Sequence, residues 1–521
     1  MTKQSFIKGT LILLAAGIIN RILGFIPRMT LPRVIGAEGI GLYQMGWPFL
    51  VVILTLVTGG IPVAVAKLVA AAEAEGNEAR IRSIFRISLA LSAALGLFFG
   101  AAILYAAPWI TRHVFTDPRV YYTFLCMTPI VPIVAVSSVF RGYFQGRHNM
   151  IPTALSQVIE TMIRIVTVLL FAYWMIPYGI EYAAAGAMVG VTVGEIGAML
   201  VLAGIYLHGR RSQPGKPRAR IGSNHAPNRW TNLKNLLKLA LPITGSKLVG
   251  SGSYLLESIL IVHSLAAAGI ATGVATAQYG ALQGMVIPVL LLPSALTFSL
   301  AISLVPSLSE AAARGDMKTI HMRLHQSLKL ALVTGAPFAV LMYVLAEPIC
   351  LYMYNQPGVG AMLRMMAPAA LFIYLQAPLQ SALQALERPG SALLNTLIGS
   401  TVKLALICLL ASRPEFGILG AVVAITVNIM LVTVLHWNSM VRLLQFRMHS
   451  SEFLKVGVSM AAAGLSSYSV MSSGWLPDGF GKFASACFTG LAIYLVAAVV
   501  LRLIERDDVW RIVMLGKKLV K

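Results

Sequence analysis

Apolar runs of roughly 20 residues recur along this chain from one end to the other, and short polar stretches separate them. A helix of that length crosses a bilayer and satisfies its own backbone hydrogen bonds inside lipid. The pattern therefore predicts an all-α integral membrane protein with about fourteen transmembrane helices. The expected spans cover residues 8–34, 43–70, 87–108, 121–143, 152–177, 183–207, 239–265, 278–305, 328–350, 361–386, 392–412, 418–440, 455–473 and 483–504.

The first twelve spans read as a duplicated unit, because several positions recur in the same order at one common offset of 239 residues. The matched positions are Pro129 and Pro368, Gln145 and Gln384, Arg164 and Lys403, and Gly76-Asn77 and Gly315-Asp316. Each copy holds six spans, an even number, so both copies have the same membrane orientation. Parallel repeats of this kind place a transport site at their interface, near the middle of the membrane.

The duplication predicts two pseudo-symmetric six-helix lobes, residues 1–207 and 239–440. Residues 208–238 lie between them and are rich in Pro, Gly, Ser, Asn and Arg, without any acidic residue. They are expected to form a basic cytoplasmic linker near anionic headgroups. Residues 441–521 hold the last two helices and a basic tail.

Two polar segments inside the lobes, residues 71–86 and 307–329, interleave charges with Ile, Leu and Met. That spacing is typical of amphipathic helices. We expect both segments to lie on the membrane surface.

The net charge of +22 would suggest a nucleic-acid partner in a water-soluble protein. Here most of the 41 Lys and Arg fall in alternate loops and at the adjoining span ends. This bias follows the positive-inside rule and predicts that both termini are cytoplasmic. The charge is thereby explained by topology and by attraction to anionic lipids, so no nucleic-acid partner is expected.

Six cations and three carboxylates fall inside the expected spans. A charge at the centre of a membrane helix costs about 2.5–3.5 kcal/mol on insertion scales, so such side chains usually face a cavity or a partner. The cations are Arg21, Arg28, Arg33, Arg164, Lys247 and Lys403, and the carboxylates are Glu160, Glu195 and Glu257. The excess of positive charge predicts an electropositive chamber that accepts an anionic cargo.

The first span holds the stretch Asn20-Arg-Ile-Leu-Gly-Phe-Ile-Pro-Arg28. Arg21 and Arg28 are seven residues apart, so they share nearly one helix face, about 10 Å apart along the axis. Two guanidiniums at that separation can engage a phosphate and its neighbour through bidentate hydrogen bonds. We expect both to face the cavity with Asn20, whereas Arg33, near the outer end, fits snorkelling better.

The fifth span places Glu160 and Arg164 at i, i+4, a spacing that permits an intrahelical ion pair. A structural role and a cavity role stay open for this pair, although the repeat-matched Lys403 favours a lined cavity. In the seventh span, Lys247 and Glu257 can share a face without touching. Glu257 can respond to a proton or cation, or can pair with a cation on another helix.

The sixth span contains a ladder of glycines just before Glu195. These small residues are Gly186, Gly190 and Gly194. Such ladders let membrane helices approach closely. We therefore expect this stretch to pack helices rather than to bind a ligand.

Several chemical signatures are missing from the sequence. There is no phosphate-binding loop of the G-x-x-x-x-G-K-[ST] type, no plausible nucleophile–base–acid set and no metal-ligand cluster. The four cysteines are isolated and lack metal or redox spacing. The chain is therefore not expected to be an enzyme or to hold a cofactor or metal.

Several motifs resemble the polysaccharide-transport branch of the MOP (multidrug, oligosaccharidyl-lipid, polysaccharide) exporter superfamily, and its sporulation members in particular. They include Arg-x-Leu-Gly-Phe at 21–25, Gly36-x-x-Gly-x-Gly-Leu-Tyr43, Arg141-Gly-Tyr-Phe-Gln-Gly146 and Val305-Pro-Ser-Leu-Ser-Glu310. The resemblance covers essentially the whole chain. It implies fourteen helices in two lobes, alternating access, and outward flipping of undecaprenyl-linked sugars, with a role in spore-cortex peptidoglycan for the sporulation members.

The lipid II flippase family within this branch has an Arg-x-Leu-Gly-Phe-x-Arg pattern in its first span. Here it corresponds to Arg21 and, with one extra residue, to Arg28. That family also has an arginine in the eighth span, where this chain has Gln278, Tyr279 and Gln283 instead. Our hypothesis is that Lys247 supplies the missing charge.

The function expected from the sequence is a flippase for an undecaprenyl-pyrophosphate-linked glycan, a peptidoglycan precursor. Its expected site residues are Asn20, Arg21, Arg28, Glu160, Arg164, Lys247 and Lys403, with Glu257 for ion coupling. A cation-coupled multidrug exporter is the first alternative, but a cationic cavity would repel its mostly cationic cargos. The second alternative is a non-transporting scaffold of a cell-wall synthesis complex.

The partners expected from this reading are few. They are the lipid-linked oligosaccharide, anionic membrane lipids and cell-wall synthases. We expect the protein itself to be a monomer in the cell membrane.

Overall fold

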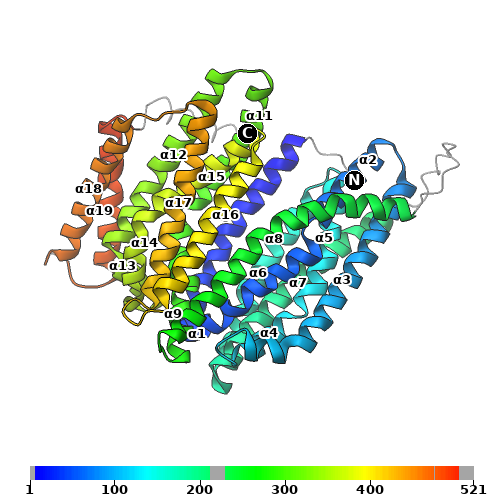
Figure 1. Cartoon of the computed structure of the whole chain (residues 1–521), viewed down its shortest axis with the longest axis horizontal. Helices are drawn as coiled ribbons and strands as arrows, with labels where there is room; N and C mark the ends of the chain where they lie inside the picture. The colour runs from blue at the N-terminus through cyan, green and yellow to red at the C-terminus, as the bar shows by residue number, and fades with distance from the viewer. Residues whose placement is uncertain (1–5, 212–228, 475, 504–521) are drawn as a thin grey trace. The chain divides into compact units, whose positions relative to one another are not determined.

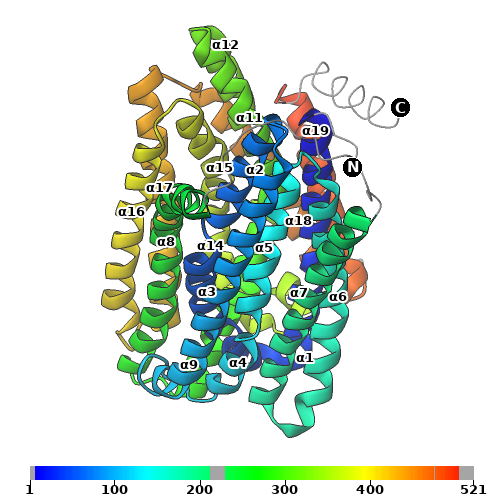
Figure 2. The same ribbon diagram turned by 90° about the vertical axis from the view of Figure 1, so that its right-hand side faces the viewer.

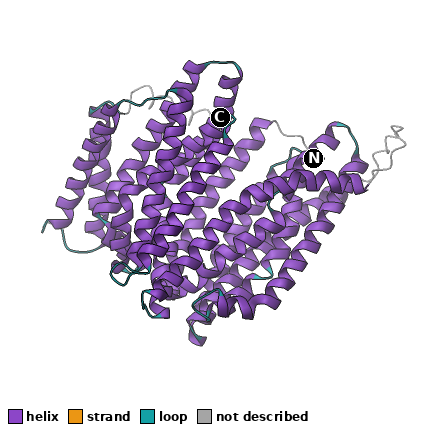
Figure 3. Cartoon of the chain, viewed as in Figure 1, coloured by secondary structure: helices purple, strands orange, loops and turns teal. Residues whose placement is uncertain are grey.

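The computed structural model describes residues 6–211, 229–474 and 476–503. Within these ranges the chain is built from helices joined by short loops, and no strand is present (Figure 3). The predicted all-α class is confirmed. Most of the basic linker, residues 212–228, and the basic tail from residue 504 onward lie outside the described residues.

Twelve helical segments in the described part of the chain are long and apolar enough to cross a membrane, so the chain is a multi-pass membrane protein. The count of fourteen is not confirmed, and two segments explain the difference. The first two expected spans form one continuous segment, Ala15–Ala74, and the thirteenth is a helix, Ser450–Ser472, that is not among the twelve.

The chain divides into two compact units, and the first comprises residues up to Gly284 together with Ser412–Pro414. Figure 1 labels its helices along the blue-to-green part of the chain. They are α1 (Phe6–Thr58), α2 (Ile61–Ala74), α3 (Glu78–His113), α4 (Val120–Met127), α5 (Ile130–Gly146), α6 (Ile151–Met175), α7 (Ile180–Arg211), α8 (Arg229–Ala267) and α9 (Thr272–Ala281).

The second unit comprises Met285–Ala411 and the chain from Glu415 onward. Its helices are α10 (Ile287–Leu291), α11 (Ser294–Ala313), α12 (Met317–Val344), α13 (Ala346–Tyr354), α14 (Gly360–Met366), α15 (Ala370–Ala385), α16 (Pro389–Leu406), α17 (Ile418–Leu444), α18 (Ser450–Ser472) and α19 (Phe480–Val500). The last two form a hairpin (Figure 1). The helices α8 and α9 cluster with the first unit because they pack on α1.

The duplication is visible in matching turns. Gly76 and Gly315 have positive φ angles of 65° and 68°, and each precedes a helix N-cap. The Asn77 side chain accepts a hydrogen bond of 2.9 Å from Arg80 N, and Asp316 accepts one of 3.0 Å from Thr319 N. Such caps satisfy backbone donors at a helix start.

These turns also correct the prediction of surface helices at 71–86 and 307–329. Each segment consists of the end of one long helix and the start of the next, folded back at the glycine. Polar and apolar residues alternate there because each segment contains the polar ends of two apolar helices. No separate surface helix is needed to explain the pattern.

A second pair of matching turns follows α5 and α15. His148 and Glu387, 239 residues apart, both have left-handed backbones with φ angles of 53° and 59°. Pro129 and Pro368 likewise mark matching interruptions, between α4 and α5 and between α14 and α15. The offset found in the sequence thus corresponds to repeated local structure.

The long helix α1 bends at Gly36, whose φ of 67° and ψ of −178° are not helical. Beyond the bend, α1 crosses α9 closely. A Cβ atom at Gly41 would clash with the Thr276 carbonyl oxygen, and one at Gly280 would clash with the Ala37 carbonyl oxygen. The glycines of the 36–43 motif therefore permit a bend and a backbone-to-backbone crossing.

The glycine ladder of α7 packs against α6, and Figure 2 shows the two helices side by side. A Cβ atom at Gly190 would clash with the backbone of Val168, and Thr167 Oγ1 donates a 2.8 Å hydrogen bond to the Gly190 carbonyl oxygen. The predicted packing role of the ladder is confirmed. Close approach of α6 and α7 also brings their carboxylates together.

Candidate functional site

A polar cavity of about 300 Å³ lies in the first unit between α1, α5 and α6. Most of its lining side chains carry hydrogen-bonding groups. The lining residues are Gly17, Asn20, Arg141, Gln157, Glu160, Thr161 and Arg164. Three of the site residues expected from the sequence, Asn20, Glu160 and Arg164, therefore meet at one cavity.

Glu160 is the buried centre of this cavity and binds two arginines. Arg141 Nη2 donates to Glu160 Oε2 at 2.9 Å, and Arg164 Nη1 donates to Glu160 Oε1 at 3.3 Å. The second contact is the predicted i, i+4 ion pair. The first contact joins α5 to α6.

Glu195 of α7 belongs to the same cluster of charged side chains as Glu160. Its carboxyl interacts electrostatically with Glu160, Arg141 and Arg164. Gly194 permits this approach, because even a Cβ atom there would lie 3.0 Å from Arg164 Cβ. The cluster thus places two carboxyl groups, Glu160 and Glu195, beside two guanidiniums.

Arg28 is not among the residues that line the cavity. It interacts electrostatically with Tyr43, as Arg164 does, and with Tyr254 of α8. Arg21 follows Asn20 on α1. Arg21 and Arg28 are both exposed on the surface of the isolated chain. The structure thus brings Arg28 and Arg164 near one tyrosine, while Arg21 and Arg28 do not line the described cavity.

Glu257 of α8 lies beside the residues that replace the expected arginine of the eighth span. Its Oε1 accepts a 3.0 Å hydrogen bond from Gln283 Nε2. One residue further along α8, Ser258 accepts a 2.8 Å hydrogen bond from the Tyr279 hydroxyl. Gln283 and Tyr279 therefore bind α8 in this structure.

Lys247 lies at the junction between α1 and α2. Its Nζ donates a 2.7 Å hydrogen bond to the Gly59 carbonyl oxygen, at the end of α1. The neighbouring Gly60 N donates to Thr244 Oγ1 at 3.0 Å. An ammonium at a helix C-terminus is favourable for both hydrogen bonding and the helix dipole, so the geometry gives Lys247 a structural contact.

Lys403 belongs to the second unit, where its side chain is buried on α16. Asn395, two turns earlier on the same helix, is also buried and donates to His436 Nδ1 at 3.2 Å and to Ser439 Oγ at 2.9 Å. The second unit therefore has its own buried polar face between α16 and α17.

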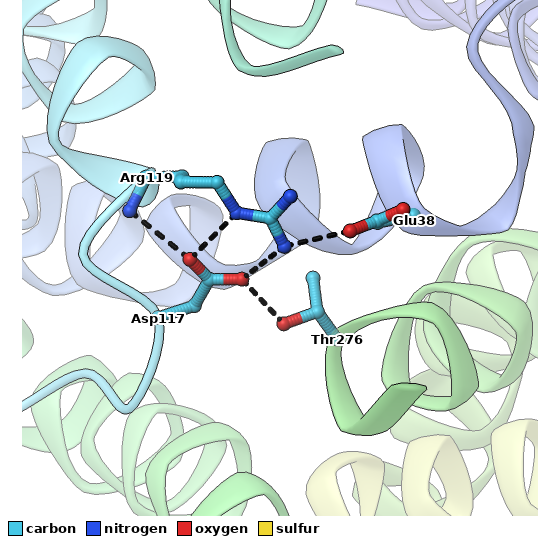
Figure 4. Close-up of polar contacts among 4 residues, drawn as sticks. All are labelled: Glu38, Asp117, Arg119 and Thr276. Atoms are coloured by element: carbon cyan, nitrogen blue, oxygen red, sulfur yellow. Dashed lines mark hydrogen bonds and ion pairs between the residues drawn. The ribbon is translucent and has the colours of Figure 1, made fainter. Parts of the chain in front are cut away.

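A second polar cluster, the Asp117 network, lies around the loop before α4 and is drawn in Figure 4. The cavity residue Arg141, in contrast, lies near the end of α5. Arg119 contacts Asp117 Oδ2 at 2.8 Å and Glu38 of α1 at 2.7 Å. Thr276 of α9 donates a 2.9 Å hydrogen bond to Asp117 Oδ2. The network joins α1, α9 and the loop before α4.

The contacts of this network change the proton affinity of its charged members. Burial alone would raise the pKa of Asp117, but hydrogen bonds from Arg119 and Thr276 outweigh it and lower that pKa. The hydrogen bond to Asp117 in turn raises the pKa of Arg119. Both groups are therefore held in their charged forms.

Sequence reasoning missed Arg141, because it lies near the end of an expected span, where a cation needs no special explanation. Arg141 and Glu160 lie at unequal distances from the turn between α5 and α6, so their pairing does not follow from the spacing of the two spans. No spacing signal exists either for Asp117 and Thr276, which are 159 residues apart.

Comparisons with known proteins agree with this architecture. Residues 6–312 match the family described as polysaccharide biosynthesis protein, and residues 256–409 match the MatE family. The chain is 39% identical to stage V sporulation protein B of Bacillus subtilis (strain 168), with both chains covered completely. It is 23% identical to lipid II flippase MurJ of the same organism, over 77% of each chain.

Solved structures show the same fold at low identity. A structure of lipid II flippase MurJ in an inward closed conformation matches with a TM-score of 0.66 and 14% identity, covering 95% of this chain and 99% of that one. An inward-facing multidrug resistance MATE family transporter of the MOP superfamily matches with a TM-score of 0.62 and 16% identity, covering 84% and 95%.

The matched proteins whose names state an activity are a lipid II flippase and a multidrug transporter, which are transport proteins rather than enzymes. The identity across the full length and the family match over more than half of the chain lead to one assignment. The chain belongs to the polysaccharide biosynthesis protein family.

Proposed function

We propose that this protein carries an undecaprenyl-pyrophosphate-linked glycan outward across the cytoplasmic membrane. The cargo we propose is a peptidoglycan precursor used for the spore cortex. The observation that carries the proposal is the placement of charged and polar side chains inside membrane-spanning helices. Asn20, Arg141, Glu160 and Arg164 line a cavity there, and Arg21 and Arg28 lie on the same first helix.

The chemistry of this region suits a headgroup with phosphates and sugars. Arginine binds phosphate oxygens through two parallel charge-assisted hydrogen bonds, which are roughly twice as strong as neutral ones. A cation inside a spanning helix is costly unless it has a function or a partner. The full-length relative named for sporulation and the lipid II flippase relative support the same class of cargo.

We further propose that transport occurs by alternating access between the lobes 1–207 and 239–440, with both termini in the cytoplasm. Parallel repeats in other transporters rock about a site between them. A cysteine introduced at Ser212 should then react with a membrane-impermeant thiol reagent only after permeabilisation, whereas one introduced at Asp478 should react in intact cells. The opposite labelling pattern contradicts this orientation.

The test of function is translocation of a labelled undecaprenyl-linked precursor in proteoliposomes. We expect Arg21→Ala and Arg28→Ala to abolish translocation, and lysine at either position to restore only part of it, because an ammonium lacks the planar fork. The matched control is Arg314→Ala, since Arg314 is a largely exposed arginine paired with Glu310. Full activity of the Arg21→Ala, Arg28→Ala double variant would rule out the mechanism.

The same proteoliposomes separate the two alternatives. A multidrug exporter would move a cationic dye and leave the lipid-linked precursor in place. A scaffold would move neither. Transport of the precursor alone supports the proposed function.

A further inference from the structure

The cavity lined by Asn20, Arg141, Gln157 and Glu160 differs chemically from a phosphate site. Its two guanidiniums already bind a carboxylate, and Glu195 supplies a second carboxyl close by. The carboxylate of Glu160 already takes up part of both guanidiniums and repels a phosphate. Arg21 and Arg28, in contrast, lie outside the lining of this cavity.

Two buried polar atoms of the lining residues have no hydrogen-bond partner in the protein. Asn20 Oδ1 is an acceptor and Arg141 Nε is a donor. A buried polar atom without a partner costs about 1–3 kcal/mol, so each such atom in a native structure calls for an explanation. A ligand that both donates and accepts hydrogen bonds would satisfy the two atoms, and a fully ionised phosphate, which only accepts, would not satisfy the acceptor.

The remaining lining groups point to the same ligand chemistry. A carboxamide presents one acceptor and one donor group, a guanidinium presents five donors in a fixed fork, and a carboxylate presents two acceptors. Adjacent hydroxyls of a sugar ring offer both donors and acceptors. Gln157, Glu160 and Arg164 supply these groups from successive turns of α6.

On this basis we propose that the cavity binds the first sugar of the lipid-linked cargo through its hydroxyl and amide groups. This inference rests on the proposed function and divides the headgroup into two parts. The pyrophosphate is held by the arginines of α1, and the uncharged sugar is held by the cavity between α1, α5 and α6. Glu160 positions Arg141 and Arg164 so that their remaining N–H groups face the sugar.

The test compares two probes on the full chain in detergent micelles. One is undecaprenyl pyrophosphate, and the other is the same lipid carrying a single N-acetylglucosamine. Their dissociation constants are measured by microscale thermophoresis for the wild type, Asn20→Leu, Gln157→Met and the control Gln326→Met. Gln326 is an exposed glutamine on α12, outside the cavity.

We expect the wild type and Gln326→Met to bind the sugar-bearing probe more tightly than the bare lipid. Asn20→Leu and Gln157→Met should each reduce this preference by up to about tenfold, which corresponds to the loss of one or two neutral hydrogen bonds. Because the preference is a ratio measured within one variant, it does not depend on the fraction of protein that folds.

Two results would overturn the inference while leaving the proposed function standing. One is equal affinity of the wild type for both probes, and the other is an unchanged preference in both cavity variants. A loss of bare-lipid affinity in Asn20→Leu and Gln157→Met as large as the loss for the sugar-bearing probe would show a phosphate site instead. If the wild type binds neither probe, the proposed function fails together with the sugar site.

Discussion

The Thr276 hydroxyl donates a 2.9 Å hydrogen bond to the Asp117 carboxylate and so connects α9 to the loop before α4. Both side chains are buried, and Asp117 is only 1% exposed. Arg119 extends the connection to Glu38 of α1 (Figure 4). By the sequence repeat, α9 belongs to the second six-helix lobe, yet in this structure it is tied to two elements of the first.

Removing the Thr276 hydroxyl should loosen this connection. Thr276→Val keeps the shape of the side chain but removes the hydrogen bond to a charged acceptor, a loss of about 1.5–3 kcal/mol. We expect a lower midpoint of thermal unfolding in detergent than for the wild type. Thr276→Ser keeps the hydroxyl and is the control, and equal midpoints for Val and Ser would show that the hydrogen bond contributes nothing.

The Asp117 network should also make stability depend on pH. The folded pKa of Asp117 is lowered from its ordinary value of 3.8, so its ionised form stabilises the folded state. That contribution is fully present above the ordinary value and is lost as the pH falls through the lower, folded value. We expect the difference in unfolding midpoint between the wild type and Asp117→Asn to shrink over that interval, and a constant difference would contradict the assignment.

The sequence was sufficient to predict the parts of the site that follow from local spacing. Glu160 and Arg164 are one helical turn apart, so their ion pair could be inferred from the fifth span alone. The offset between Gly76 and Gly315 likewise identified two turns that the structure shows to be alike. These features depend only on the geometry of a helix or a turn.

Contacts between distant segments were not predictable in this way. The sequence suggested that Lys247 lines a cavity, and that assignment remains a prediction, but its ammonium bonds to Gly59, 188 residues away. Helix periodicity places a side chain on a face and does not tell which neighbour that face meets. The same reason explains why the pairing of Arg141 with Glu160 was not anticipated.

The crossing of α1 and α9 should tolerate no side chain at Gly41. A methyl group there would meet the Thr276 carbonyl oxygen, which is backbone and cannot rotate away. We expect Gly41→Ala to destabilise the protein by about 1–3 kcal/mol, as overpacking typically does. Gly24→Ala is the control on the same helix, because open space surrounds Gly24. Equal unfolding midpoints for the two variants would contradict the close crossing.

Lys247 should stabilise the junction between α1 and α2 even without cargo. Lys247→Met leaves the Gly59 carbonyl oxygen without its donor, which is expected to cost about 1–3 kcal/mol. Lys234→Met, at an exposed position on the same helix, controls for the loss of a charge. The measurement is thermal unfolding of the cargo-free protein, and a midpoint equal to that of the control would leave Lys247 available for cargo.

Glu160 should be required for folding because it compensates two arginines inside the membrane. Glu160→Gln replaces the carboxylate that bonds to both Arg141 and Arg164 with a neutral amide and leaves only Glu195 as a nearby carboxyl. Breaking a buried ion pair from one side costs about 3–5 kcal/mol. We expect a reduced yield of folded protein, measured by size-exclusion chromatography after solubilisation. Adding Arg164→Gln should restore part of that yield, since one uncompensated cation is removed.

The double variant whose yield is restored should still fail to translocate cargo, because Arg164 lines the cavity. Normal yield in the single variant would show that the ion pairs do not stabilise the fold, and normal transport in the double variant would exclude the cavity from the transport path.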